Sequence, residues 1–212
     1  NENYRYFHLR DTAGQERDFH FHDFDKLVFL LEGNVEYAVE GTSYNLGPRD
    51  VLLVRHHTIH KANIDISVPY DRIIIYINRS YIDSLFPNAK LMECFDNADR
   101  DRSYLFKPTD EQFEDIMRVA AQYEQSEKDN LFGSKTMCDT CIVQFLIHMG
   151  RLAKSSEQTD IVLKDPKIEQ VLSYINEHFN EQLTVEQLAD EIFLSRYHFM
   201  RLFKAQMGTT VH

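Results

Sequence analysis

The chain has 212 residues, 43% of them hydrophobic and 27% charged, which is the composition of an ordinary globular protein with room for two structural units. It has no apolar run long enough to span a bilayer and no charged-then-apolar leader. The three cysteines make no disulfide framework, so we expect a cytoplasmic protein without membrane contact. A formal net charge of −11 argues against nonspecific nucleic-acid binding by the whole chain, but it permits a local basic helix.

Residues 1–106 have the pattern of an antiparallel β-barrel. Short β-rich runs follow one another without intervening helical patterns, which indicates a sandwich or small barrel and not a parallel sheet. Compact turns at Gly33 and Gly41 are suited to hairpins. The predicted strands span residues 4–9, 18–22, 26–31, 35–39, 43–46, 51–55 and 72–78.

Two motifs in this region carry imidazoles. The first contains His20 and His22, and the second runs from Gly47 to His60. Together they resemble the two motifs of the cupin jelly roll. In metal-binding cupins the first motif supplies two histidines and a glutamate, and the second supplies one histidine. The resemblance therefore matches His20, His22 and His60 to the three imidazoles, while Lys26 stands at the glutamate position.

Three interpretations of these histidines stay open. An ammonium cannot ligate a divalent cation, so Lys26 argues against a metal and we expect none, although three imidazoles with open positions can bind zinc. The rings can also be an inherited scaffold, each bonded to backbone. The third interpretation, which we adopt, is a pocket for a sugar-like or anionic effector inside the barrel. Its predicted residues are His20, His22, Lys26, Arg55 and His60.

Two of these side chains have alternative orientations. Lys26 either points inward to an acidic ligand or lies at the barrel mouth with its stem packed and its ammonium in water. Arg55 points into the barrel or outward, because the alternation of its strand is not secure.

Residues 107–160 predict two helices that bridge the domains. Thr109 begins the first with a good cap. The second, through about Lys154, has too many apolar residues for one narrow stripe, so we expect it to contact both its own barrel and another surface. A monomer would leave part of Phe145, Met149 and Leu152 in water, which predicts a dimer interface over residues 138–152. Cys138 and Cys141 have the spacing of a redox motif, but core packing is favoured.

Residues 161–212 predict a leading helix followed by a helix-turn-helix. Thr184 begins one short helix with a capping box, Ser195 is an N-cap candidate for the next, and Gly208 is suited to end it. Two such helices that pack through apolar faces and join by a tight turn make a helix-turn-helix. The apolar residues at helical spacing are Leu188, Ala189, Ile192, Phe199, Leu202, Phe203 and Met207.

The second helix of this pair, residues 196–207, is the candidate DNA-reading element. No Asp or Glu occurs from Ser195 to His212, although the chain as a whole is acidic. Carboxylates would be repelled in a phosphate-lined groove, so their absence indicates DNA binding; the alternative is a solvated basic face. The residues that project from the non-apolar face are Arg196, Tyr197, Met200, Arg201 and Lys204.

The caps, the spacer and the apolar positions from Ile168 to Gly208 closely resemble the first helix-turn-helix of AraC/XylS-type bacterial transcription regulators. A cupin-like barrel is the common effector-sensing domain of that family, and its sensor domains often dimerise through the helical pair. The resemblance implies that Tyr197, Met200 and Arg201 face base edges, whereas Arg196 and Lys204 lie nearer the phosphates. Family members have two such helix-turn-helix units, and we expect only the first within this chain.

The sequence thus predicts an α+β chain with three parts: a cupin-like β-barrel (jelly roll) in residues 1–106, a helical linker and dimerisation pair in 107–160, and a partial DNA-binding domain in 161–212. The predicted function is that of a homodimeric transcription regulator that senses a small molecule and binds operator DNA, with no cofactor and no enzymatic activity. The alternative is a metal-dependent cupin enzyme, an isomerase or dioxygenase. A third interpretation is a dimerisation scaffold whose barrel senses nothing.

Overall fold

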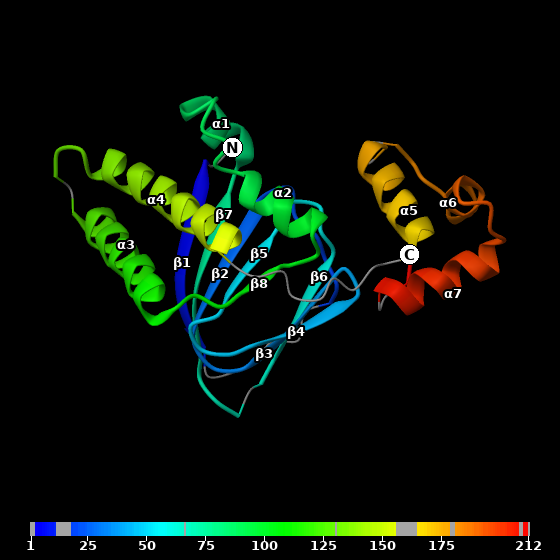
Figure 1. The fold of residues 1–212 in the computed structure, drawn as a ribbon, viewed down its shortest axis with the longest axis horizontal. Coiled ribbons are helices and arrows are strands. Elements are labelled where there is room, and N and C mark those ends of the chain that lie inside the picture. Colours follow the sequence, from blue (N-terminus) through cyan, green and yellow to red (C-terminus); the bar gives the residue numbers. More distant parts are fainter. Residues whose placement is uncertain are drawn as a thin grey trace.

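The computed structural model describes residues 3–11, 18–65, 67–129, 131–155, 165–178, 181–207 and 210–211. Two antiparallel sheets form the N-terminal part, a pair of long helices covers one face of the larger sheet, and three helices make the C-terminal unit (Figure 1). This arrangement confirms the predicted α+β class. No helix in the described ranges is long and apolar enough to cross a membrane.

The two sheets enclose the interior of the barrel. The larger sheet has the order β1-β7-β2-β5-β8, and the smaller has the order β4-β3-β6. The strands are β1 (Tyr4–Asp11), β2 (Asp25–Glu32), β3 (Val35–Val39), β4 (Thr42–Leu46), β5 (Val51–Val54), β6 (His60–Ile64), β7 (Tyr70–Ile77) and β8 (Leu105–Phe106). The predicted strand at residues 18–22 was wrong, because only His20 pairs there, in a single bridge to His60. Strands β6 and β8 were not predicted.

Successive side chains along a strand of the large sheet point alternately to the apolar core and to the interior of the barrel. On β7, Ile73, Ile75 and Ile77 are fully buried in the apolar core, whereas Arg72 and Tyr76 line a cavity on the opposite face. Both faces of the sheet are covered, which explains why the central strands β2 and β5 are apolar nearly throughout. The sheet therefore has one face for the helices and one for the interior of the barrel.

Two short helices follow β7 and were not predicted. They are α1 (Arg79–Leu85) and α2 (Glu93–Arg100). Asn78 caps α1 by accepting a hydrogen bond from the Ser80 N–H. On α2, Phe95 and Ala98 are buried, while Asp96 and Asp99 face the barrel arginine Arg55.

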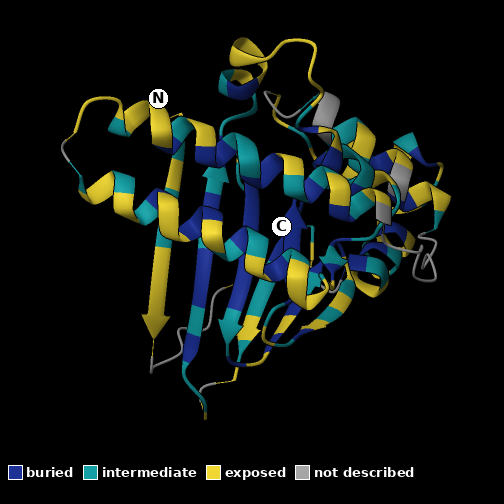
Figure 2. Ribbon diagram, turned by 60° about the vertical axis from the view of Figure 1, so that its left-hand side comes forward, coloured by how far each residue is buried: buried dark blue, intermediate teal, exposed yellow. Residues whose placement is uncertain are grey.

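Helices α3 (Asp110–Lys128) and α4 (Ser134–Ser155) lie side by side across the large sheet, with their outer faces exposed (Figure 2). Thr109 and Gln112 form the capping box of α3, which confirms the predicted start. Cys138 and Cys141 are buried free thiols, as the core interpretation predicts.

The predicted exposure of α4 was wrong. Phe145, Met149 and Leu152 are 0%, 1% and 5% exposed within a single chain. Helix α4 packs on the large sheet, on α3 and on α2, and these three neighbours account for its high apolar content. The apolar density of residues 138–152 therefore does not require a second protomer.

The C-terminal unit consists of α5 (Pro166–Glu177), α6 (Val185–Glu191) and α7 (Arg196–Met207). The capping box of Thr184 and Gln187 starts α6 as predicted, and Pro166 occupies the first turn of α5. The predicted helix end at Gly208 lies outside the described residues. The core of the unit is formed by Ile168, Val171, Leu188, Ala189, Ile192, Phe199, Phe203 and Met207.

Two points of the barrel touch this unit. Ile59, next to β6, packs against the apolar core of the three helices. Gly41, in the β3–β4 turn, approaches the end of α7 so closely that a Cβ atom there would clash with the carbonyl oxygen of Gln206. Gly41 also has φ +80°, so this position favours glycine for both conformational and steric reasons.

Candidate functional site: a barrel cavity and a basic helix

The barrel interior holds a cavity of about 340 Å³ between the two sheets. This size is at the lower end of the range typical of small-molecule sites, so the cavity suits a small ligand. Its polar lining comes from both sheets and from the segment before β2, and includes His20, Lys26, Tyr37, Tyr70, Arg72 and Tyr76.

Lys26 is an interior residue. Its side chain is 5% exposed, and its ammonium donates a hydrogen bond of 2.7 Å to the hydroxyl of Tyr37. Strand pairing places Lys26 opposite Tyr76, another residue of the cavity lining. The alternative of a solvated ammonium at the barrel mouth is therefore wrong.

The three histidines form a cluster. One ring nitrogen from each of His20, His22 and His60 lies within 4.8 Å of the others. The Nδ1 atoms of His20 and His60 lie 2.7 and 2.9 Å from the carbonyl oxygens of Asp18 and Thr58. A carbonyl only accepts, so each Nδ1 carries the hydrogen and, in the neutral ring, Nε2 presents a lone pair.

His60 is held neutral. Burial and the nearby charge of Lys26 lower the pKa of His60 from 6.5 to about 2. Its Nε2 is fully buried and has no hydrogen-bond partner among the described residues. A neutral ring with a buried lone pair accepts a hydrogen bond from a ligand, or binds a metal.

The donor set fits a divalent metal poorly. Three imidazoles can ligate zinc, but the position that supplies a carboxylate in metal-binding cupins holds the Lys26 ammonium, whose charge already acts on His60. A like charge inside the barrel opposes the binding of a cation. The described residues therefore favour an organic ligand in this cavity.

Arg72 is the interior arginine that the sequence did not identify. Its guanidinium lies 4.1 Å from the centre of the Tyr70 ring, donates to the carbonyl oxygens of Leu9 and Tyr70, and pairs with Asp11 at 2.6 Å. Its Nε is buried and has no partner in the part of the chain that the structure describes. An unmet donor on a buried cation is an anchor for an acceptor atom of a ligand.

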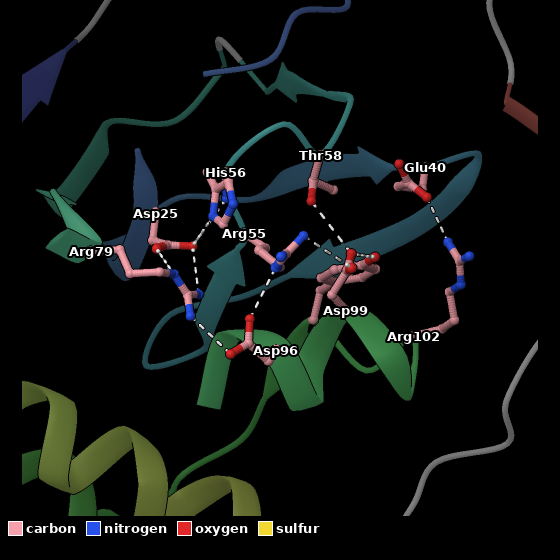
Figure 3. A network of polar contacts seen from close by, with 10 residues as sticks. Asp25, Glu40, Arg55, His56, Thr58, Arg79, Asp96, Asp99 and Arg102 are labelled. Carbon is pink, nitrogen blue, oxygen red and sulfur yellow. Dashed lines mark hydrogen bonds and ion pairs between the residues drawn. The ribbon is translucent and has the colours of Figure 1, made fainter. Parts of the chain in front are cut away.

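Arg55, which was predicted to bind the effector, lies outside this cavity. Its Nε donates to Asp96 at 3.0 Å, and its Nη1 lies 3.9 Å from Asp99, so α2 holds it on the outer side of β5 (Figure 3). Burial alone would raise the pKa of Asp96, but Arg79 and Arg55 hold it below its usual range. Of the two orientations left open by the sequence, Arg55 takes the outward one, because the acids of α2 attract it.

We expect His60 to make folding stability depend on pH. The unfolded chain protonates His60 below about pH 6.5, whereas the folded chain keeps it neutral to about pH 2. The unfolded state binds more protons in this window, so stability falls as pH falls, by about 2 kcal/mol from pH 7 to pH 5. Urea denaturation at both pH values measures this change.

His60→Gln provides the comparison, because glutamine does not titrate. Its loss of stability between pH 7 and pH 5 should be smaller than that of the parent protein. Burial also lowers the pKa of His57 and His148, but both are present in the two proteins, so the difference isolates His60. Equal losses of unfolding free energy in the parent protein and in His60→Gln would contradict the lowered pKa of His60.

Helix α7 presents the residues predicted to meet DNA. Phe199 and Phe203 face the core of the unit, and the opposite side is exposed at Tyr197, Arg201 and Lys204. Met200 is partly buried. The face is therefore available to a partner.

Arg196 is engaged within the unit itself. Its Nη1 lies 2.7 Å from the carboxylate of Glu186 on α6, and both side chains are more than half exposed. Exposed pairs of this kind are weak and screened by salt, so this contact leaves Arg196 able to exchange partners.

Two family models match the chain. The model of the AraC-like ligand binding domain matches residues 3–134, and the model of bacterial regulatory helix-turn-helix proteins of the AraC family matches residues 175–212. The first match covers more than half of the chain.

Curated relatives are regulators. The activator RhaS of Escherichia coli (strain SMS-3-5 / SECEC) is 23% identical over 90% of this chain and 66% of its own length. An uncharacterized HTH-type transcriptional regulator of Staphylococcus aureus (strain COL) is 22% identical over 87% of this chain, which spans only 24% of that longer protein.

Among solved structures, the AraC-like transcriptional activator CuxR is 12% identical, with a TM-score of 0.45 over 86% of this chain and 61% of that one. A cupin-like protein of Thermotoga maritima is 16% identical, with a TM-score of 0.34 over 37% of this chain and 60% of that one. By its sensing domain and its helix-turn-helix alike, the chain belongs to the AraC family of bacterial transcription regulators.

Proposed function

We propose that the protein regulates transcription by binding operator DNA through α7 and a small-molecule effector in the barrel cavity. The observation that carries this proposal is the union, in one chain, of a polar cavity and a helix-turn-helix whose second helix exposes cations and no carboxylates. The hydrogen bonds that tie Lys26 to Tyr37, and His20 and His60 to backbone carbonyls, hold these polar groups in place and support their role as a binding surface. Selection of a random duplex library on the full-length protein should enrich one sequence family, and absence of enrichment would refute DNA recognition.

The proposed effector site keeps four predicted residues and exchanges the fifth. It consists of His20, His22, Lys26 and His60, with Arg72 in place of Arg55. His20, Lys26 and Arg72 line the cavity, whereas the rings of His22 and His60 lie behind the lining, 4.8 and 4.5 Å from the ring of His20.

We expect two α7 substitutions to weaken DNA binding in different ways. If Arg201 faces a base edge, Arg201→Ala costs roughly 1–3 kcal/mol and relaxes specificity at one base pair. If Lys204 faces a phosphate, Lys204→Ala weakens all sequences alike and lowers the salt slope by about 1. Titrations of selected and scrambled duplexes at several salt concentrations measure both effects.

Lys128→Ala is the matched control, because Lys128 is an exposed lysine at the end of α3, outside the helix-turn-helix. It should leave affinity and salt slope unchanged. Loss of affinity without any change of sequence preference in both α7 variants would contradict the assigned roles.

The regulator is further proposed to act in the cytoplasm as a homodimer, joined by the outer faces of α3 and α4. The support is residual apolar exposure: Met137 and Ile147 on α4 and Leu131 and Phe132 in the preceding turn stay accessible. Sedimentation of the protein at high concentration tests this, and a monomer there would exclude the dimer.

A further inference from the structure

Two buried polar atoms, one in the lining of the barrel cavity and one directly behind it, lack partners among the described residues, and they are opposite in kind. Arg72 lines the cavity, and the His60 ring lies 4.5 Å from that of His20, a lining residue. Arg72 Nε is a donor on a permanent cation, and Nε2 of neutral His60 is an acceptor. Buried polar atoms are nearly always bonded in folded proteins, so each of them implies a partner that the described part of the chain does not supply.

The charges of the lining bias the chemistry of this partner. The cavity is lined by two cations, Lys26 and Arg72, and by one carboxylate, Asp11, within the described residues. Asp11 already pairs with Arg72 at 2.6 Å. A ligand that adds one negative charge would balance the lining, and charge-assisted hydrogen bonds to guanidinium and ammonium groups are strong.

The histidines require a hydrogen-bond donor from the ligand and not a negative charge. His20 and His60 both use Nδ1–H on backbone carbonyls, so their Nε2 lone pairs can only accept when the rings are neutral. A carboxylate oxygen does not satisfy an acceptor, but a hydroxyl does, because it donates its hydrogen. The Tyr37 ring, stacked beside His60 with centroids 6.0 Å apart, adds a flat apolar wall.

We infer that the effector is a small hydroxylated acid, such as a sugar acid or hydroxy acid, whose acid group meets Arg72 and Lys26 and whose hydroxyl hydrogens meet His60 and His20. The inference rests on the proposed function only in taking the cavity as the effector site. The cavity volume of about 340 Å³ limits the ligand to a small molecule.

The test uses thermal shifts of the full chain with four probes at millimolar concentration: D-gluconate, D-glucose, hexanoate and zinc chloride. Gluconate has both the acid and the hydroxyls, glucose only the hydroxyls, and hexanoate only the acid. We expect gluconate to raise the melting temperature more than glucose or hexanoate does. Glucose 6-phosphate, as a fifth arm, distinguishes a carboxylate from a phosphate.

Variants assign the two halves of the site. Lys26→Met should lower the affinity for gluconate roughly tenfold or more, to a value near the affinity of the parent protein for glucose. His60→Phe should lower the affinity for gluconate to a value near the affinity of the parent protein for hexanoate. Arg55→Met is the matched control, because it removes a cation outside the cavity and should leave gluconate affinity unchanged. The melting temperature without ligand shows whether each variant is folded.

Several outcomes overturn the inference. An increase in melting temperature with glucose equal to that with gluconate would show a site for neutral sugars. Stabilisation by zinc alone that is lost in His20→Ala would show a metal site. No response to any hydroxylated acid in the folded protein would exclude the ligand class. Selection of operator DNA on the same full-length preparation separates the two failures, because DNA recognition without an acid response refutes only the ligand.

Discussion

Phe145→Glu is expected to unfold the sensing domain and not to separate two protomers. The Phe145 ring is fully buried, with its centroid 5.6 Å from that of Phe29 and 6.5 Å from that of Tyr6. A glutamate there removes the aromatic packing and places a carboxyl group in an apolar core, which together cost about 4 kcal/mol or more. Urea denaturation followed by near-UV circular dichroism measures the loss.

Ile147→Glu is the matched control, because Ile147 is on the same helix but is 37% exposed. It should leave the stability of the fold nearly unchanged, and under the proposed dimer it should weaken association. A well-folded Phe145→Glu protein would contradict the observed burial of α4.

The second large effect is expected at Asp25, a fully buried carboxylate at the start of β2 (Figure 3). It accepts hydrogen bonds from the His56 backbone N–H at 3.0 Å and from Arg79 Nε at 3.2 Å. Asp25→Ala leaves both donors without their partner and removes the charge that compensates the half-buried Arg79, which should cost about 3–5 kcal/mol.

Asp96→Ala offers a direct comparison. Asp96 also binds Arg79, at 2.8 Å, but its side chain is 42% exposed, so water can replace the lost carboxylate. Its substitution should cost about 1 kcal/mol or less. Equal losses of unfolding free energy for Asp25→Ala and Asp96→Ala would show that burial does not decide the strength of this network.

Features set by local chemistry were predictable from the sequence. The capping boxes at Thr109 and Thr184 involve residues three positions apart, so they are legible without tertiary structure, and the structure contains both. The helix-turn-helix followed from the same kind of signal. By contrast, α1 and α2 have only 7 and 8 residues, about two turns each, which is too short for a clear helical periodicity in the sequence.

The arginine of the cavity could not be chosen from the sequence. Arg55 and Arg72 both fell within predicted strands, and a shift of one residue sends a side chain to the opposite face of a sheet. The face of Arg72 is fixed by the pairing of β7 with β1 and β2, and the direction of Arg55 by Asp96 and Asp99 on a helix that was not predicted. Both are long-range contacts.

The same limit applies to the apolar content of α4. The sequence shows how much apolar surface the helix has, but it does not show how many neighbours cover that surface. Here the large sheet, α3 and α2 cover it together. The apolar residues of α4 that had indicated a partner chain are therefore buried within one chain.

Under the proposed function, the adjacency of Ile59 and His60 makes the path from the effector site to the DNA-binding unit very short. His60 belongs to the histidine cluster, of which His20 lines the cavity. Ile59 packs on the core of the DNA-binding unit, and its carbonyl accepts a hydrogen bond from the N–H of Glu40, beside Gly41. Neighbouring residues of an extended segment are separated by about 3.3 Å along the chain. A ligand that shifts the His60 backbone therefore also shifts the surface against which α7 rests, with no intermediate chain of side chains. Sensitivity to the proposed effector is thus expected to depend on the size of residue 59, although Ile59 is not part of the cavity lining.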